Sequence, residues 1–402
     1  MTEPKITIVI PTRERCDVLE SSLRTATAQD YENLEIIVSD NYSSDDTANV
    51  VQRANDRRVR YLNTEKRLSM SHNWEFALSH VDDGWVTFMG DDDGLLLGSI
   101  SSVADIICAT NAKAIRSNFC TYDWPGVNGQ DHGQLIVPLG NSIEIRKADL
   151  WLSKVMHGRA KYSQLPMIYN GGFIHMSVLR GIVKNTGSYF LSANPDVYSA
   201  IAISRSINHY VYVDTPFAVS GTSKHSNGHS NFSVTSQRND TPRKQFSSEG
   251  NIPFHADMPL CTDGSYPRSL QACVYEAYLQ SEALGKHVPG VTAEQQLRII
   301  MATSGKHRSS IMEWGKLFAE MHGIYYADVK RSAERKRYQL QSLATARKIL
   351  NAANSIITES LPINNIHEAS VAASAIMLRP GRMDSARFLA KQAIHLTRSW
   401  LR

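Results

Sequence analysis

Short runs of β-branched residues alternate with helix-like segments over the first hundred positions. The runs KITIVIPT (5–12) and LEIIVSD (34–40) have the continuous apolar character of buried strands. Between them, residues 15–29 carry apolar side chains at helical spacing. The alternation continues to GWVTFMG (84–90), and this order of elements predicts a parallel sheet with helices on its faces. Ligands of such sheets bind beyond the carboxyl ends of the strands.

The pattern divides the chain into three parts. Up to about residue 230 strand and helix signals are mixed, whereas residues 231–250 are rich in Ser, Asn and Thr, which is typical of a flexible loop or linker. From 251 to 402 strand signals almost vanish, and segments such as 341–357 and 385–401 have the pattern of amphipathic helices. We therefore predict an α/β domain at 1–230, the linker, and an all-helical C-terminal domain at 251–402.

Composition narrows the class of protein. Of the 402 residues, 42% are hydrophobic, which is enough for a full core. The net charge of +4 is small for this length, so we expect no nucleic-acid partner. The five cysteines are scattered without a C-x-x-C spacing, which argues against a disulfide framework or a zinc site and fits a cytoplasmic location. No apolar run reaches the roughly 18 residues of a membrane-spanning helix, so we expect any membrane contact to be peripheral, at the inner face.

Three consecutive carboxylates, Asp91 to Asp93, follow the strand-like run GWVTFMG. One interpretation is a polar turn that caps the next helix. The other is a divalent-cation site, because clustered oxygen ligands beside a ligand crevice suit Mg²⁺ or Mn²⁺, which can neutralise a diphosphate. The first strand ends in IVIPTRER without the G-x-G-x-x-G of a dinucleotide fold, so phosphates bound here need a metal ion and basic side chains.

Four ordered motifs stand in the first hundred residues. ITIVIPTRER is a strand followed by P-T-x-N-R, with Glu14 in place of Asn, and LEIIVSDNYSSDDT is a strand followed by D-D/N-x-S-x-D-x-T. A basic residue then precedes an Asn-bearing helix, and a further strand ends in GDDDG, which contains D-x-D. This order resembles the family 2 glycosyltransferases. The resemblance implies a GT-A fold with a mostly parallel sheet, and a metal-dependent, inverting transfer of a hexose or N-acetylhexosamine in bacterial surface polysaccharide synthesis.

The resemblance also implies a role for particular residues. It assigns the nucleotide to Pro11, Arg13, Asp40, Asn41, Arg67, Asp91 and Asp92. It assigns the metal ion, Mn²⁺ or Mg²⁺, to Asp91 and Asp93, with Asp93 as the more direct ligand. His225, in the loop after the last predicted sheet strand, is a further candidate metal ligand, although an isolated loop histidine is usually only solvated.

Asp196 is the candidate catalytic base. Asn194 and Pro195 are typical of a helix start, which makes Asp196 a first-turn residue. The helix dipole favours the ionised carboxylate there, as removal of a proton from an acceptor hydroxyl requires. Asp196 also matches the place where the resembled family carries its base. The alternative is a carboxylate that only caps the helix.

Two other functions are compatible with part of the pattern. A nucleotidyltransferase also uses a parallel sheet and a carboxylate-bound metal, but it usually carries a Gly-rich basic loop that PTRERCDV lacks. A catalytically inactive sugar-nucleotide-binding protein is the second alternative.

For the enzyme, we expect a nucleoside-diphosphate sugar as donor and a saccharide or lipid-linked saccharide as acceptor. The basic C-terminal helices indicate a solvated face, peripheral membrane contact, or pairing between copies of the chain.

Overall fold

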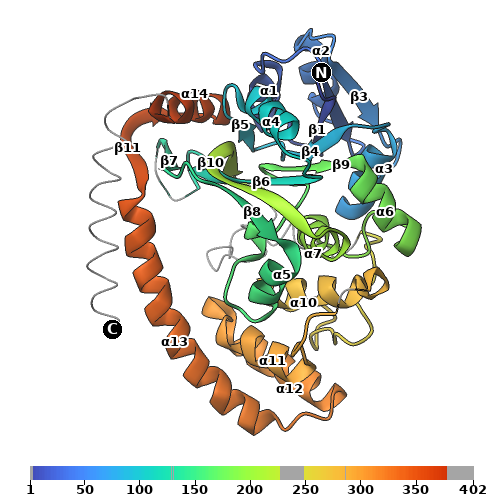
Figure 1. The fold of residues 1–402 in the computed structure, drawn as a ribbon, viewed down its shortest axis with the longest axis vertical. Helices are drawn as coiled ribbons and strands as arrows, with labels where there is room; N and C mark the ends of the chain where they lie inside the picture. Colours follow the sequence, from blue (N-terminus) through green and yellow to red (C-terminus); the bar gives the residue numbers. More distant parts are fainter. Residues whose placement is uncertain (1–2, 128, 130, 227–248, 286, 378–402) are drawn as a thin grey trace.

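The computed structural model describes residues 3–127, 129, 131–226, 249–285 and 287–377. Most of the predicted linker at 231–250 and the whole predicted helix at 385–401 lie outside these residues. The described chain forms one large mixed sheet with helices on both faces, and a further group of helices that Figure 1 shows below the sheet.

The amino-terminal part is the predicted alternation of strands and helices. Its elements are β1 (Ile6–Thr12), α1 (Cys16–Thr27), β2 (Leu34–Asp40), α2 (Thr47–Arg53), β3 (Val59–Asn63), α3 (Met70–Ser79) and β4 (Trp85–Phe88). The strands lie in the order β4-β1-β2-β3 and are all parallel. Alternate residues of β1 serve two cores, because Ile8 and Ile10 pack with α1 whereas Val9 packs with α3. The carboxyl ends of four strands therefore meet at one edge.

The middle of the chain adds antiparallel strands to this sheet. Its elements are β5 (Gly94–Leu95), α4 (Ser99–Ala109), β6 (Ala114–Asp123), β7 (Gly133–Pro138), β8 (Ile143–Lys147), α5 (Ala148–Met156), the 3₁₀ turn η1 (Tyr162–Gln164), β9 (Gly172–His175), α6 (Met176–Thr186), α7 (Pro195–Ser206) and β10 (His209–Thr222). β9 lies antiparallel between β4 and β6, and β10 runs parallel to β6. The helix α7 begins at Pro195, as the sequence predicts.

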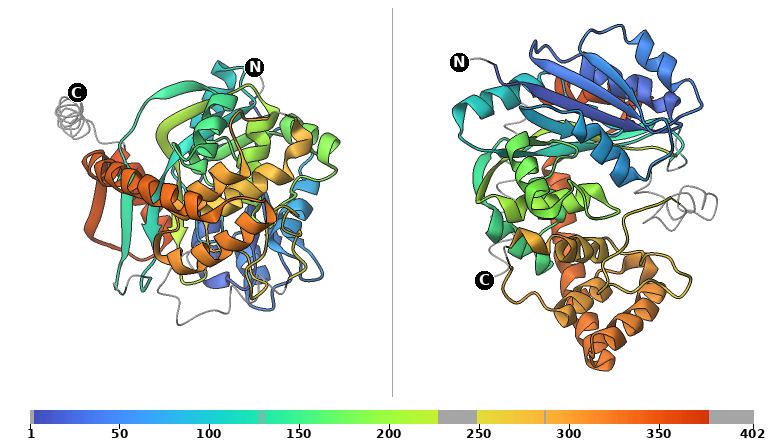
Figure 2. Two further views of the ribbon diagram at one scale, coloured as in Figure 1. Left: turned by 90° about the horizontal axis from the view of Figure 1, so that it is seen from below. Right: turned by 90° about the vertical axis from the view of Figure 1, so that its right-hand side faces the viewer.

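The C-terminal segment is helical up to Ala353. Its helices are α10 (Leu270–Gln280), α11 (Ala293–Ala302), α12 (Arg308–Met321) and α13 (Tyr326–Ala353), with single 3₁₀ turns at η3 (Glu282–Leu284) and η4 (Gly305–His307). α10 packs against α7, and α11 packs against α13. Figure 2 shows this group of helices on one side of the sheet. The predicted helical character of the C-terminal part is confirmed for these elements.

The chain then returns to the sheet, which the sequence pattern did not predict. β11 (Ser355–Ile363) pairs antiparallel with β7, and α14 (Ile366–Met377) packs against α1 and β10. The hypothesis of a helix over 341–357 is therefore wrong at its end, where the β-branched run Ile356 to Thr358 pairs with the open edge of β7. The described part of 251–402 is not helical throughout.

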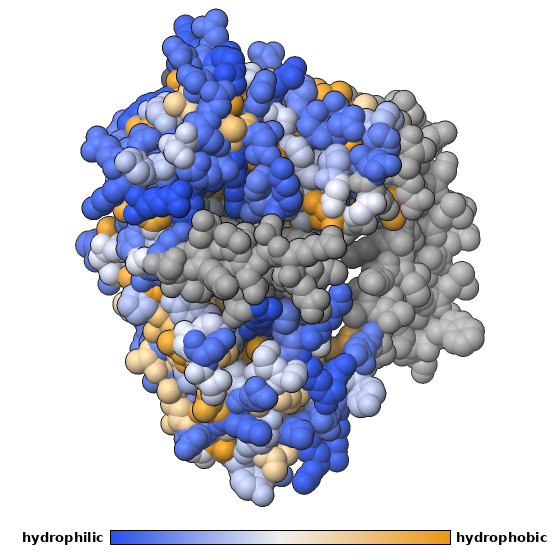
Figure 3. Space-filling view, turned by 180° about the vertical axis from the view of Figure 1, so that it is seen from behind, coloured by the Kyte–Doolittle hydropathy of each residue, from blue (hydrophilic) through white to orange (hydrophobic). Residues whose placement is uncertain are grey.

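The hydropathy of the surface differs between the upper and lower parts of the molecule. Figure 3 shows, on the face opposite to that of Figure 1, a mostly hydrophilic surface over the upper part of the molecule, with hydrophobic residues more frequent over the lower part. Among the helices in the described ranges, none is long and apolar enough to cross a membrane.

Candidate active site

A cavity of about 520 Å³ opens at the carboxyl ends of β1, β2 and β4. The predicted residues that line it are Pro11, Arg13, Asn41, Asp91, Asp92 and Asp196. The predicted residues Asp40, Arg67, Asp93 and His225 are not among the lining residues. Two tyrosines from the segment before β9, Tyr162 and Tyr169, line the cavity as well. The cavity therefore joins the ends of the first strands to the start of α7.

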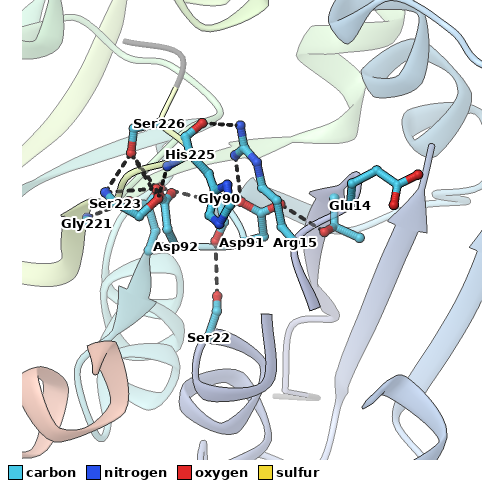
Figure 4. A network of polar contacts seen from close by, with 12 residues as sticks. Glu14, Arg15, Ser22, Gly90, Asp91, Asp92, Gly221, Ser223, His225 and Ser226 are labelled. Atoms are coloured by element: carbon cyan, nitrogen blue, oxygen red, sulfur yellow. Dashed lines mark hydrogen bonds and ion pairs between the residues drawn. The ribbon is translucent and has the colours of Figure 1, made fainter. Parts of the chain in front are cut away.

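Asp91 contacts the end of β1 and the loop that follows it. Its Oδ2 accepts a hydrogen bond from Thr12 Oγ1 at 2.9 Å, and its Oδ1 forms an ion pair with Arg15 Nη1 at 2.9 Å. Burial raises the pKa of Asp91, and the positive charge of Arg15 opposes that shift. In Figure 4 the guanidinium of Arg15 points toward Asp91. Arg15 thus supplies positive charge where the sequence predicts a metal ion.

Asp92 is held by the loop that follows β10 (Figure 4). Ser223 Oγ and Ser226 Oγ donate hydrogen bonds to its Oδ2 at 2.7 and 2.5 Å. Within the described residues, Oδ1 of Asp92 accepts no hydrogen bond. Gly221 lies against the Asp92 backbone so closely that an added Cβ would stand 1.8 Å from the carbonyl oxygen. Only glycine fits this contact without displacing the strand end.

Asp93 is fully buried beneath its two neighbours. Its Oδ2 accepts hydrogen bonds from Tyr169 Oη at 2.5 Å and from the Gly90 amide at 3.0 Å, and its Oδ1 accepts one from the Gly221 amide at 2.7 Å. Burial, followed by the negative charge of Asp92, raises the pKa of Asp93 to about 7. Both side-chain oxygens of Asp93 thus accept hydrogen bonds from the protein, and Asp92 rather than Asp93 lines the cavity. Direct metal ligation by Asp93 stays a prediction.

Asp40 and Asn41, predicted to hold the nucleoside, both organise the loops after β2 and β3. Tyr61 Oη donates to Asp40 Oδ2 at 2.5 Å, and the Ser43 amide donates to Asp40 Oδ1 at 3.0 Å. The amide group of Asn41 pairs with both backbone groups of Leu68, donating to its carbonyl at 2.7 Å and accepting from its amide at 2.8 Å. Nucleoside binding by either residue stays a prediction.

The two predicted arginines lie in different places. Arg13 lines the cavity and forms an ion pair with Glu249, which also lines it. Arg67 lies outside the cavity lining, with 47% of its side chain exposed and its guanidinium 3.1 Å from Glu14. Arg13 therefore lies at the cavity and Arg67 does not, and nucleotide binding by either arginine stays a prediction.

His225 is placed beside α1 rather than in the cavity. Its Nε2 lies 3.1 Å from Asp17 Oδ2, and its backbone carbonyl accepts a hydrogen bond from Arg15 Nη2 at 2.5 Å. The imidazole would have to leave Asp17 to reach a metal ion at Asp92. Its role as a metal ligand stays a prediction.

Asp196 lies in the first turn of α7, at the other end of the cavity from the strand ends. Tyr162 Oη donates a hydrogen bond to its Oδ2 at 2.9 Å. The argument from the helix dipole favours the ionised form, but burial raises the pKa of Asp196, and the hydrogen bond from Tyr162 only opposes that shift. A raised pKa brings the carboxylate closer to the working pH, where a general base is most effective.

Three residues of the site escaped the sequence-based assignment: Arg15, Tyr162 and Tyr169. The P-T-x-N-R motif itself ends at Arg15, so the motif contained the signal for that residue. The tyrosines come from an irregular segment with no motif of its own, and the fold alone brings them to the carboxylates. Burial and then the charges of Asp93, Asp92 and Asp196 raise the pKa of Tyr169, whose hydroxyl donates to Asp93.

Two solved structures are similar to this chain in overall fold. Staphylococcus aureus TarS 1-349 in complex with UDP-GlcNAc is 13% identical, has a TM-score of 0.48, and is matched over 83% of this chain and 92% of that chain. The mannosyltransferase PcManGT from Pyrobaculum calidifontis, in complex with GDP-Man and Mn²⁺, is 17% identical with a TM-score of 0.38, over 84% of this chain and 88% of that chain. Both TM-scores are too low to assign roles to residues.

Sequence comparisons identify the amino-terminal part. The GalNAc(5)-diNAcBac-PP-undecaprenol beta-1,3-glucosyltransferase of Campylobacter jejuni is 40% identical over 103 residues, and the uncharacterized protein MT1568 of Mycobacterium tuberculosis is 30% identical over 102 residues. These matches span 33% and 32% of the relatives, about a third of their length, and 25% of this chain. The family model described as Glycosyl transferase family 2 matches residues 7–163, the span from β1 to η1 that carries Asp91 and Asp92. Residues 7–163 are therefore a glycosyl transferase family 2 domain.

Proposed function

We propose that this chain transfers a hexose or N-acetylhexosamine from a nucleoside-diphosphate sugar to a hydroxyl group of a saccharide. One observation carries the proposal: a single cavity has Asp91 and Asp92 at the strand ends and Asp196 at the start of α7. The C. jejuni relative, a glucosyltransferase by name, and the family match over residues 7–163 support the same class of reaction.

The strand-end carboxylates fit a divalent cation. Mg²⁺ and Mn²⁺ are commonly bound by one or two carboxylates, with substrate phosphates and water completing the shell. Asp92 has an oxygen without a partner among the described residues, and Asp91 lies next to it at the cavity. Within the described chain no three acidic, His or Cys residues are grouped so as to hold a metal ion, so donor phosphates would have to complete the shell. A bound ion would neutralise charge on the departing nucleoside diphosphate.

Asp196 would take the proton of the acceptor hydroxyl as that oxygen attacks the anomeric carbon. The hydrogen bond from Tyr162 to Oδ2 orients the carboxylate at the cavity. Arg15, and Arg13 if it leaves Glu249, would add positive charge at the diphosphate end. One base and no second nucleophile at the α7 end of the described cavity favour a single displacement, which inverts the anomeric centre.

We further propose a lipid-linked saccharide as the acceptor. The name of the C. jejuni relative contains a glycan joined to undecaprenol through PP. In this chain, α13 presents Lys330, Arg335 and Tyr338 to solvent, and Tyr325 directly precedes the helix; the two tyrosines Tyr325 and Tyr338 are 72% and 75% exposed. Basic and aromatic side chains favour contact with an anionic membrane surface, which would bring the cavity to a lipid-linked acceptor at the inner face of the membrane.

Replacing Asp196 by Asn tests the proposed base. The amide keeps the size of the side chain and its ability to cap the helix, but it cannot take a proton. We expect turnover to fall about 10²- to 10⁴-fold while the donor dissociation constant and the melting temperature stay near those of the wild type. Steady-state kinetics, donor binding and melting curves of Asp196→Asn and Asp196→Ala would be compared. An active Asp196→Asn enzyme would exclude Asp196 as the base.

A further inference from the structure

We propose that Arg116 is a positioning residue for the active site: it fixes the segment 162–170, whose two ends bring Tyr162 to Asp196 and Tyr169 to Asp93. The proposal rests on the proposed role of Asp196. It adds a residue that lies outside the cavity lining and outside every motif of the sequence.

Arg116 reaches one segment of main chain from strand β6. Its side chain is buried, with 1% of the residue exposed. Its Nε donates a hydrogen bond to the Ser163 carbonyl at 2.7 Å, and its Nη1 donates to the carbonyls of Tyr169 and Asn170 at 2.9 and 2.7 Å. Ser163 lies in η1, and Tyr169 and Asn170 lie in the irregular segment between η1 and β9. One guanidinium therefore joins the two ends of the segment 162–170.

The charge of Arg116 is not neutralised by a carboxylate. No ion pair of Arg116 occurs within the described chain, and the titratable groups that act on its pKa are three tyrosines, whose own pKa values are raised by burial. Burial lowers the pKa of Arg116 to about 10. Removing a cation from water without a counter-ion costs of the order of several kcal/mol. If this position served packing alone, an apolar side chain would therefore be more favourable than an arginine. The guanidinium offsets part of this cost by donating three hydrogen bonds to backbone carbonyls.

The backbone that Arg116 holds is in an uncommon conformation. Asn170 has a φ of 48° and Gly171 a φ of 87°, both in the left-handed region. Such a conformation is disfavoured for a residue with a Cβ and persists where the surroundings fix it. The hydrogen bonds from Arg116 to the carbonyls of Tyr169 and Asn170 lie at this turn. Backbone hydrogen bonds also tie the turn to its neighbours: the Asn170 amide donates to the Phe88 carbonyl at 2.9 Å, and the Ser117 amide donates to the Gly171 carbonyl at 2.8 Å. The contacts from Arg116 add the side-chain link that joins this turn to Ser163, so we expect their loss to loosen the position of Tyr162 relative to Tyr169.

The two ends of the segment bind two different aspartates, and both tyrosines line the cavity. Tyr162 Oη donates to Asp196 at 2.9 Å, and Tyr169 Oη donates to Asp93 at 2.5 Å. The titratable groups that face Asp196 are Tyr162 of η1, Tyr169, and Cys273 of α10. Of these, Tyr162 holds the pKa of Asp196 down through its hydrogen bond, against the larger effect of burial. Displacing Tyr162 should therefore raise the pKa of Asp196 further.

The test measures the pKa of Asp196 directly. The carboxyl carbon shift of Asp196 would be followed by NMR against pH in the wild type, Tyr162→Phe, Arg116→Lys, Arg116→Gln and the double variant Tyr162→Phe with Arg116→Lys. We expect the pKa to rise in each single variant and to rise no further in the double variant, because both changes remove the same hydrogen bond. We also expect kcat to fall about 10- to 100-fold in Arg116→Lys.

Arg205 provides a matched control. It is also buried, and its Nη1 donates to the Tyr278 carbonyl at 2.9 Å, but it lies at the far end of α7 from Asp196. We expect Arg205→Lys to lower the melting temperature and leave the pKa of Asp196 unchanged.

Two results would overturn the proposal. One is a folded Arg116 variant in which the pKa of Asp196 is unchanged although Tyr162→Phe raises it. The other is that neither Arg116 variant folds under conditions where Arg205→Lys folds, which would make Arg116 a residue of general stability. Both results are distinct from failure of the proposed function, because the NMR titration needs neither donor nor turnover. An active Asp196→Asn enzyme would refute Asp196 as the catalytic base. It would leave untouched the proposed effect of Arg116 on the pKa of Asp196.

Discussion

Three adjacent aspartates, Asp91 to Asp93, have the same side chain but different partners. Asp91 pairs with Arg15, Asp92 is bound by serine hydroxyls, and Asp93 is bound by Tyr169 and two backbone amides. The sequence places all three at a strand end but contains nothing that tells them apart, because the partners come from distant parts of the chain. The division of roles among the three is therefore a property of the fold.

Replacing Asp92 by Asn should remove metal-dependent donor binding. The amide offers a weaker ligand to a hard cation than the carboxylate does. We expect the affinity for a nucleoside diphosphate in the presence of Mn²⁺ to fall to the level measured with a chelator, with little change in melting temperature of the protein alone. Titration calorimetry would measure this. Asp17→Asn, which changes the nearby carboxylate that faces His225, is the control and should bind like the wild type. Unchanged Mn²⁺-dependent affinity in Asp92→Asn would contradict the assignment.

Strands and helices with strong local patterns were predicted well. β1 to β4 and the helices between them appear where the apolar spacing indicates, because the core on each face of the sheet demands that spacing. β11 was not predicted. Its pairing partner β7 lies more than two hundred residues earlier in the chain, and the local pattern alone does not indicate this pairing. The same holds for the segment between η1 and β9, whose conformation depends on Arg116.

Helix α10 is tied to the start of α7 by a buried acid. Glu276 of α10 is fully buried and accepts hydrogen bonds from Ser192 Oγ at 2.6 Å and Gln280 Nε2 at 2.9 Å. The amide of Asn194, which precedes α7, donates to the same Ser192 hydroxyl at 3.3 Å. The C-terminal helices are thereby connected to the helix that carries Asp196.

This link should make stability depend on pH. Burial raises the pKa of Glu276 to about 7, above the roughly 4.3 of an unfolded glutamate, so the folded protein holds the proton more tightly. The resulting stabilisation is complete below the unfolded pKa and is lost as pH rises through about 7. We expect the unfolding free energy of the wild type, relative to Glu276→Gln, to fall between about pH 3.5 and pH 8 by about 1.4 kcal/mol for each unit by which the pKa is displaced.

Urea unfolding at several pH values would measure the effect. Glu282→Gln, which changes an exposed carboxylate on the turn after α10, is the control. A wild-type stability that rises relative to Glu276→Gln over the same interval would contradict the prediction.

The molecule as a whole combines a sheet with a cavity at its edge and helices that close one side of it. Donor binding should therefore be visible as a change in global stability. A ligand that binds only the folded protein raises the melting temperature by mass action, by an amount that grows with its concentration above the dissociation constant. We expect at least one of UDP and GDP to raise the melting temperature in Mn²⁺ and to lose most of this effect in a chelator. An equal rise with and without the chelator would show that metal is not needed for nucleotide binding.

The pairing of β11 with β7 has a consequence for synthesis of the protein on the ribosome. β7 is made early, but its partner strand and α14, whose Ser370 donates to the Leu95 carbonyl beside the Asp cluster, come near the end of the described chain. At translation rates of about 5 to 20 residues per second, the edge of β7 waits roughly 10 to 45 s for its partner. During this time an unpaired edge can accept a strand from another chain. Nascent copies on one polysome are therefore most exposed to mispairing at β7. Charged substitutions on β11 should slow its pairing with β7. We expect them to lower the yield of soluble protein more than they lower the stability of the folded protein.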